Sequence, residues 1–149
     1  MNNRELVLNI VLFFVYVIIQ VFFAKNLELF GLAFCFLYIN YILLLPIDMS
    51  RMVFLLIAFA MGFLIDLFYD TLGMHAAALV LIAYLRPFVI SIVSSKNEIF
   101  EISLKETGLR WFLSYLSVMI FIHHLLLFLL QQFSFRLIFK TLLKTGAST

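Results

Sequence analysis

The sequence predicts an all-α protein: a polytopic membrane bundle of about five transmembrane helices, followed by a C-terminal amphipathic basic helix. Of its 149 residues, 66% are hydrophobic and 12% are charged, whereas soluble domains contain about 45–50% apolar and about 25% charged residues. Polar residues also interrupt the apolar sequence at intervals close to the roughly 20 residues that one spanning helix needs. Five such helices would use most of the chain, so we expect no separate soluble domain.

Composition also excludes several classes of function. A net charge of +2, with the basic residues dispersed between apolar segments, does not favour binding of nucleic acid. The single cysteine, Cys35, excludes an intrachain disulfide and a cysteine-based metal site. The serines have neither a G-x-S-x-G setting nor an acid–base pair. We therefore predict no catalytic, cofactor or metal site, and a protein that is not an enzyme.

The first two predicted spans cover residues 6–24 and 29–47. The first is long, and the bulky Phe22 occupies the place where a signal-peptide cleavage site needs a small residue, which favours a membrane anchor. The second is interrupted by Asn40 near its middle, and Pro46 near its end is an ordinary helix stop signal.

The third and fourth predicted spans cover residues 52–69 and 74–93. Only the four residues 70–73 separate them, and they include Asp70 and Gly73, which are typical of turns. A link this short makes the two helices antiparallel neighbours in a hairpin.

The last third of the chain contains three segments. Residues 94–109 are polar with charges of both signs, which predicts a short interfacial helix or an ordered loop. The fifth span covers 110–130. In the tail, 133–145, Arg136, Lys140 and Lys144 are four residues apart and share one helical face, which predicts an amphipathic basic helix. No sixth apolar span follows.

The distribution of arginine and lysine predicts a cytoplasmic N-terminus, because these residues concentrate on the inner side of membrane proteins. This orientation places the outer ends of the third and fourth spans, with the hairpin turn, outside the cell. The inner face then receives Arg4, Arg51, Lys96, Lys105 and Arg110, while the outer face receives Lys25 and the three basic residues of the tail.

Asp66 is the most informative residue, because a carboxylate near a helix centre costs about 2.5 to 3.5 kcal/mol on insertion scales. It is either a packing device that forms a hydrogen bond between helices, which we favour, or a proton or ligand site. Gly62 lies four residues earlier on the same face and allows another helix to approach closely. By depth in the membrane, we predict a histidine of the fifth span, His123 or His124, as the partner of Asp66, with His75 as the competing choice.

Other polar residues within the spans have simpler interpretations. Arg86 lies too deep for a bridge to Asp66 and is expected to extend towards phosphates of the inner face, with Pro87 kinking or ending its helix. His123 and His124 point about 100° apart on a helix, so they do not easily bind one metal ion. In an alternative arrangement, Asp66, Asn40 and either histidine surround an internal cavity.

The order of the spans, with Gly62-x-x-x-Asp66, Gly73 and small residues from Ala76 to Ala78 opening the next helix, resembles the rod shape-determining protein MreD of bacteria. The family has six helices where we predict five spans.

The resemblance implies a multi-pass protein of the bacterial inner membrane that belongs to the cell-elongation machinery. Its implied partner is an MreC-like bitopic protein, and through it an MreB-like actin homologue and the peptidoglycan synthases. The leading expectation is therefore a non-enzymatic scaffold in the lipid bilayer that governs cell shape and peptidoglycan synthesis. Because the family also looks like the S components of energy-coupling factor transporters, the alternative is a substrate-binding subunit of a small-molecule transporter.

Overall fold

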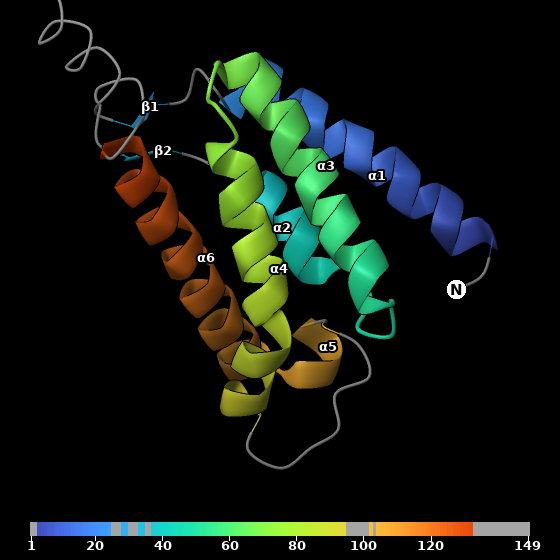
Figure 1. The fold of residues 1–149 in the computed structure, drawn as a ribbon. Helices are drawn as coiled ribbons and strands as arrows, with labels where there is room; N and C mark the ends of the chain where they lie inside the picture. The colour runs from blue at the N-terminus through green and yellow to red at the C-terminus, as the bar shows by residue number, and fades with distance from the viewer. Residues whose placement is uncertain are drawn as a thin grey trace, which may run out of the picture.

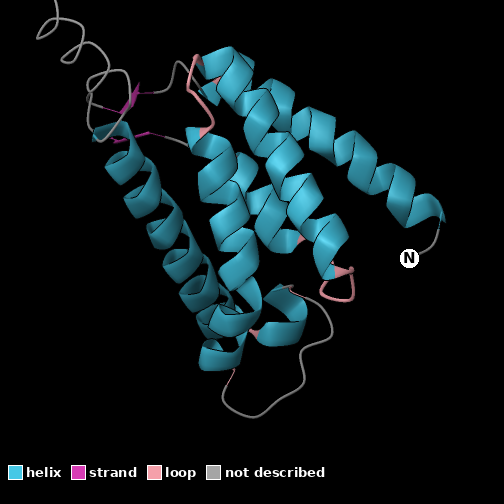
Figure 2. Cartoon of the chain, in the orientation of Figure 1, coloured by secondary structure: helices cyan, strands magenta, loops and turns pink. Residues whose placement is uncertain are grey.

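The computed structural model describes residues 3–24, 28–29, 33–34, 37–94, 102 and 104–132. Within these residues the protein is a bundle of helices, with one pair of two-residue strands beside it (Figure 1). The coloured secondary structure in Figure 2 shows that helices form nearly all of the described part of the chain. The all-helical prediction is confirmed apart from this strand pair.

The elements follow one another in the order α1, β1, β2, α2, α3, α4, α5 and α6. Their bounds are α1 Asn3–Phe22, β1 Glu28–Leu29, β2 Ala33–Phe34, α2 Tyr38–Leu44, α3 Arg51–Tyr69, α4 Met74–Val93, α5 Leu104–Thr107 and α6 Leu109–Gln132. The two strands pair antiparallel, with Glu28 opposite Phe34.

Four helices, namely α1, α3, α4 and α6, are long and apolar enough to cross a membrane. They coincide with the first, third, fourth and fifth predicted spans to within three residues at each end. This is the architecture of a multi-pass membrane protein. The predicted amphipathic tail, 133–145, and residues 95–101 and 103 of the polar segment 94–109 lie outside the described residues.

The predicted second span, 29–47, is wrong as a continuous transmembrane helix. Its described residues form the two short strands and then the seven-residue helix α2. α2 ends at Leu44, and Leu45 is already extended with ψ at 150°, as expected for a residue that precedes proline. The short helix is nevertheless central, because Tyr38, Ile39, Ile42 and Leu43 are almost completely buried.

The core of the bundle is the α3–α4 hairpin, which makes the most extensive contact in the fold and also packs against α6 through α4. Gly62 makes the close approach possible. A Cβ atom at this position would lie only 2.4 Å from the Cα of Ala76 and 2.6 Å from its backbone nitrogen. The predicted role of Gly62 in helix packing is thus confirmed.

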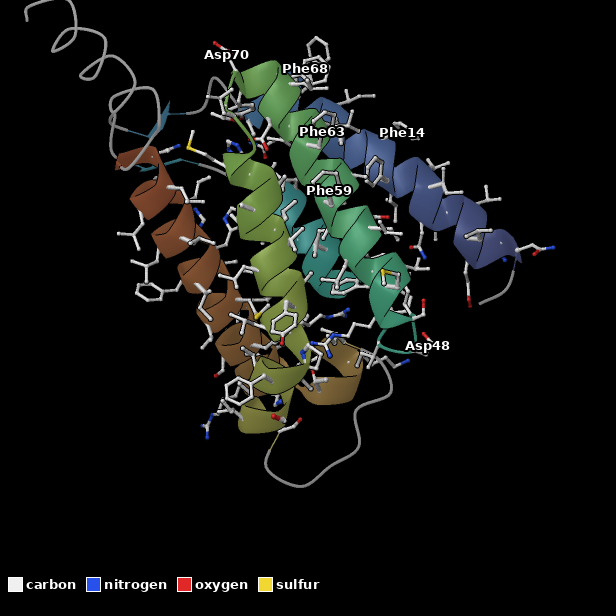
Figure 3. All side chains as sticks on the ribbon, viewed as in Figure 1. Phe14, Asp48, Phe59, Phe63, Phe68 and Asp70 are labelled. Atoms are coloured by element: carbon white, nitrogen blue, oxygen red, sulfur yellow. The ribbon has the colours of Figure 1, made fainter. Side chains whose placement is uncertain are left out.

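The outer surface of the bundle is apolar, with charged residues at its two ends. Figure 3 shows Asp48 and Asp70 at opposite ends of α3, with Phe59, Phe63 and Phe68 pointing outward between them. These three phenylalanines are about half exposed in the isolated chain. In water such a surface would be unfavourable, so it is the surface expected to contact lipid.

Candidate functional site

The candidate site begins with the carboxylate of Asp66, which joins the last turn of α3 to the first turn of α4. Its Oδ1 accepts hydrogen bonds from the Thr71 hydroxyl at 2.6 Å and the His75 backbone N–H at 2.9 Å. Its Oδ2 accepts the Ala76 backbone N–H at 2.9 Å. The side chain is buried, and both of its oxygens are engaged by protein donors.

The turn of the hairpin explains why α4 needs this carboxylate. α4 begins after Gly73, which has φ of +81° and no side chain that can cap the helix. The first N–H groups of a helix have no intrahelical acceptor, and here those of His75 and Ala76 are satisfied by Asp66 from the preceding helix. Asp66 therefore caps the N-terminus of α4 although it belongs to α3. Its negative charge lies at the positive end of the α4 dipole, which is favourable.

The His75 side chain is a further partner of Asp66. Its Nδ1 lies 2.9 Å from Asp66 Oδ1 and 2.9 Å from the Thr71 hydroxyl. The ring also packs against two tyrosines, with centroid distances of 5.2 Å to Tyr69 and 6.0 Å to Tyr38. The competing prediction, in which His75 is the partner of Asp66, is therefore confirmed.

The preferred prediction, that His123 or His124 would bind Asp66, is wrong. His123 is fully buried on α6, and its Nε2 lies 3.1 Å from the Tyr38 hydroxyl of α2. His124 bonds through Nδ1 to the carbonyl of Ile120, one turn earlier in the same helix. Equal depth in the membrane does not make two residues neighbours, because α2 supplies a tyrosine between them.

Gln20 extends the polar cluster to α1. Its Nε2 donates to the Tyr69 hydroxyl at 2.8 Å, and its Oε1 accepts the Leu37 backbone N–H at 2.7 Å. Gln20 thus connects the end of α1 to α3 and to the start of α2. Together with Asp66, Thr71, His75, Tyr69, Tyr38 and His123, it forms what we call the hairpin-end cluster.

Arg86 forms a second buried site near the other end of the bundle, so the prediction that it would extend towards lipid phosphates is wrong. Only 4% of its surface is exposed. Its Nη2 donates to the carbonyls of Leu43 and Leu45, and its Nε donates to the Tyr115 hydroxyl at 3.2 Å. Arg86 therefore caps the C-terminal end of α2, where a positive charge is favourable.

The guanidinium of Arg86 also lies 4.7 Å from the ring centroid of Phe54. Tyr115 itself donates to the Leu43 carbonyl at 3.2 Å. Arg86 of α4 thus contacts residues of α2, α3 and α6. These contacts hold the short helix α2 inside the bundle. No bridge joins Arg86 to Asp66, as expected from their depths.

The remaining sequence-predicted residues include Asn40 and the candidate metal ligands. Asn40 is half-buried on α2, and none of the hydrogen bonds described for the cluster involves it. Among the described residues, no group of three histidine, cysteine or acidic side chains is arranged to hold a metal ion. A hollow of about 480 Å³ exists at the α4–α6 end of the bundle, but Asp66, Asn40, His123 and His124 do not line it.

Sequence reasoning missed Tyr38, Tyr115 and Thr71 as members of these sites. Tyrosine and threonine are common at the ends of spans, so their presence gave no signal. Gln20 was visible as an amide inside an apolar segment, and such residues generally face a bundle interior. Burial of a tyrosine is informative only once its hydroxyl partner is known.

No protein-family model, no curated protein and no solved structure matches this chain.

Proposed function

We propose that this protein is a non-enzymatic membrane scaffold of the bacterial cell-elongation machinery, resembling the MreD family. In this role it holds an MreC-like bitopic protein, and through it an MreB-like actin homologue and the peptidoglycan synthases. Its location is the inner membrane. The motif of Gly62, Asp66 and Gly73 carries the resemblance.

The observation that supports a scaffold best is the internal use of the intramembrane polar groups. Asp66 receives two backbone N–H groups and a hydroxyl, and Arg86 donates to two backbone carbonyls and a hydroxyl. Both charges thus fix the ends of helices. A rigid bundle of fixed shape is what a scaffold must present to its partners.

The transporter alternative would use the same polar residues differently. A substrate-binding subunit needs several of them to converge on a cavity of a few hundred Å³. The hollow of about 480 Å³ is lined by residues of the opposite end of the bundle. Asp66 itself is engaged by three donors of its own chain, and this internal use supports the scaffold.

The proposed orientation has a cytoplasmic N-terminus. The Gln20–Tyr69 hydrogen bond places the end of α1 beside the end of α3, so the starts of both helices lie at the opposite end of the bundle. Arg4, Arg51, Lys105 and Arg110 are exposed at that end, whereas Asp70 is exposed at the hairpin end. Among the described residues, more positive charge thus lies at the first end, which supports its placement inside.

A depletion experiment in a rod-shaped bacterium that encodes this chain tests the function. Removing the protein should round the cells and reduce insertion of new wall material along the side wall, and the wild-type chain should restore both. A tagged copy should also capture a bitopic MreC-like protein after cross-linking. A reporter active only outside the cell should be active when fused at Thr71 and silent when fused after Ser50.

Asn40→Ala provides the matched variant, because Asn40 belongs to the transporter hypothesis and is only half-buried. A scaffold carrying Asn40→Ala should restore rod shape fully. If depleted cells instead require one vitamin or metabolite, and cells with the Asn40→Ala variant show the same requirement, the transporter hypothesis replaces the scaffold hypothesis.

A further inference from the structure

A hollow of about 480 Å³ lies where the end of α4 meets the start of α6, away from both buried charges. It is lined by Val93 of α4 and by residues that lead into and open α6. These are Thr107, Gly108, Leu109, Arg110, Trp111 and Ser114. Both helices are long enough to span the membrane and have their ends here, so the hollow lies at the level of the lipid headgroups.

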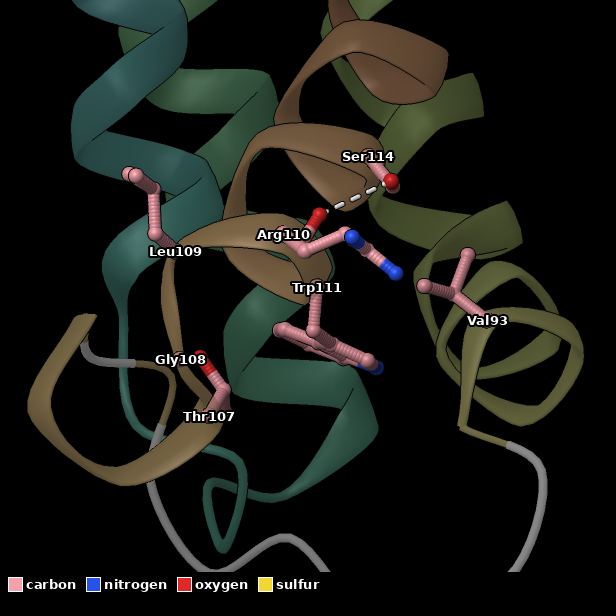
Figure 4. A pocket seen from close by; sticks show the side chains of 7 residues that line it. All are labelled: Val93, Thr107, Gly108, Leu109, Arg110, Trp111 and Ser114. Atoms are coloured by element: carbon pink, nitrogen blue, oxygen red, sulfur yellow. Dashed lines mark hydrogen bonds between the residues drawn. The ribbon is translucent and has the colours of Figure 1, made fainter.

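Arg110 supplies an exposed positive charge to this hollow. Figure 4 shows its side chain extending from α6 towards Val93, above the indole of Trp111. Within the described part of the chain, no carboxylate pairs with its guanidinium. Its backbone carbonyl accepts the Ser114 hydroxyl at 2.8 Å, which holds the first turn of α6. Among the described residues the guanidinium thus has no acidic partner, and a charge of this kind suits an anion at the hollow.

Trp111 forms the floor of the hollow and has an unused donor. Its Nε1–H is buried and has no acceptor among the described residues, an arrangement that is unfavourable for a native protein. The indole stacks on Tyr115 at 5.3 Å with an interplanar angle of 14°. Because Tyr115 is itself held by Arg86, the floor is rigid.

The backbone at the start of α6 adds a further attraction for anions. Gly108 has φ of +79° and turns the chain sharply into the helix. Its carbonyl accepts the Phe112 N–H, the first bond of α6. The preceding N–H groups lie at the positive end of a helix that continues for 24 residues.

We propose that this hollow binds the phosphate of an anionic phospholipid headgroup, with Arg110 on the phosphate and Trp111 beneath the glycerol region. The shared chemistry is an anionic phosphate ester, which a soluble molecule such as glycerol phosphate also carries. The surroundings favour the lipid, because Ile92 and Leu109 beside the hollow are more than 60% exposed and offer apolar contact to acyl chains. Tryptophan and arginine are also the side chains that favour the headgroup level.

Trp111 makes the test direct, because it is the only tryptophan in the chain. The full-length protein is placed in phosphatidylcholine vesicles, and its tryptophan fluorescence is followed as brominated lipid is added. Brominated phosphatidylglycerol should quench at a lower mole fraction than brominated phosphatidylcholine, by about fivefold for one cationic contact. Arg110→Gln should reduce that ratio to about one.

Arg51→Gln is the matched control. Arg51 is an exposed arginine at the same end of the bundle, but it lies over the ring of Tyr84 at 4.6 Å and does not line the hollow. This variant should keep the wild-type preference. Equal quenching by the two lipids, or equal loss of preference in both variants, would overturn the site. Reversal of the quenching by soluble glycerol phosphate would overturn the lipid as its occupant.

Discussion

Replacing Asp66 tests whether one carboxylate holds the start of α4. Asp66→Leu removes the acceptor of two buried backbone N–H groups, those of His75 and Ala76. Thr71 and His75 do not add to the loss, because they already lie 2.9 Å apart and can bond each other. The effect of the mutation therefore comes mainly from the two uncapped backbone donors.

Each buried donor left without an acceptor costs about 1–3 kcal/mol, so Asp66→Leu should destabilise the protein by about 2–6 kcal/mol. Asp66→Asn keeps one carbonyl oxygen and places an NH₂ group against the other donor, so about half of that loss is expected. Interhelical side-chain bonds in membranes average only about 0.6 kcal/mol because their partners find substitutes. A backbone N–H in the first turn of a packed helix has no such substitute.

Unfolding in mixed detergent micelles, followed by circular dichroism, measures these differences. Asp70→Asn is the matched control, since it makes the same chemical change four residues later at an exposed position. Asp70 has φ of +54°, and asparagine tolerates this conformation well. The expected order of stability is wild type and Asp70→Asn, then Asp66→Asn, then Asp66→Leu. A loss below about 0.6 kcal/mol for Asp66→Leu would refute the cap.

Two further predictions concern packing and the second buried charge. Gly62→Ala should destabilise the protein by about 1–3 kcal/mol, because its methyl group would meet the backbone of Ala76 at 2.4 Å; wild-type stability in the same unfolding assay would contradict this close contact. Arg86→Met should lower stability by about 1.5–3 kcal/mol, because the Leu45 carbonyl loses its donor and the Leu43 carbonyl keeps only the Tyr115 hydroxyl. This loss should exceed that of Tyr115→Phe. A gain in stability for Arg86→Met would mean that desolvation of the buried cation outweighs its bonds.

The hairpin could be predicted from the sequence because its signals are local. Two apolar segments of spanning length are separated by four residues that contain Asp70 and Gly73, and this pattern permits only an antiparallel pair. The choice of partner for Asp66 could not be predicted equally well. By helix rise, Asp66 is predicted to lie about 9 Å below the hairpin tip and the histidines about 10 Å below the predicted outer end of their span. The structure instead places Tyr38 against His123.

The short helix α2 and the burial of Arg86 could not be predicted for one shared reason. Residues 29–47 are apolar apart from Asn40, and their composition is equally compatible with a full span. What ends α2 is the proline that follows Leu45, together with a cation that arrives from α4. Arg86 comes 43 positions after Leu43 and 41 positions after Leu45 in the chain. No local sequence pattern therefore reveals this interaction. Without that contact, an arginine near the end of a span is expected to reach for lipid phosphates.

The cap on α4 also bears on how the protein enters the membrane. Asp66 and the N–H groups that it accepts are at most ten residues apart in the sequence, so the complete arrangement exists as soon as the turn has been synthesised. A lone α3 would carry an unsatisfied carboxylate into hydrocarbon, at about 2.5 to 3.5 kcal/mol. If α3 and α4 enter together, the Asp66 carboxylate and the first N–H groups of α4 can form their hydrogen bonds before α6 is synthesised. The unit that the insertion machinery handles is then the pair of helices, and Asp66 is the residue that makes them a pair.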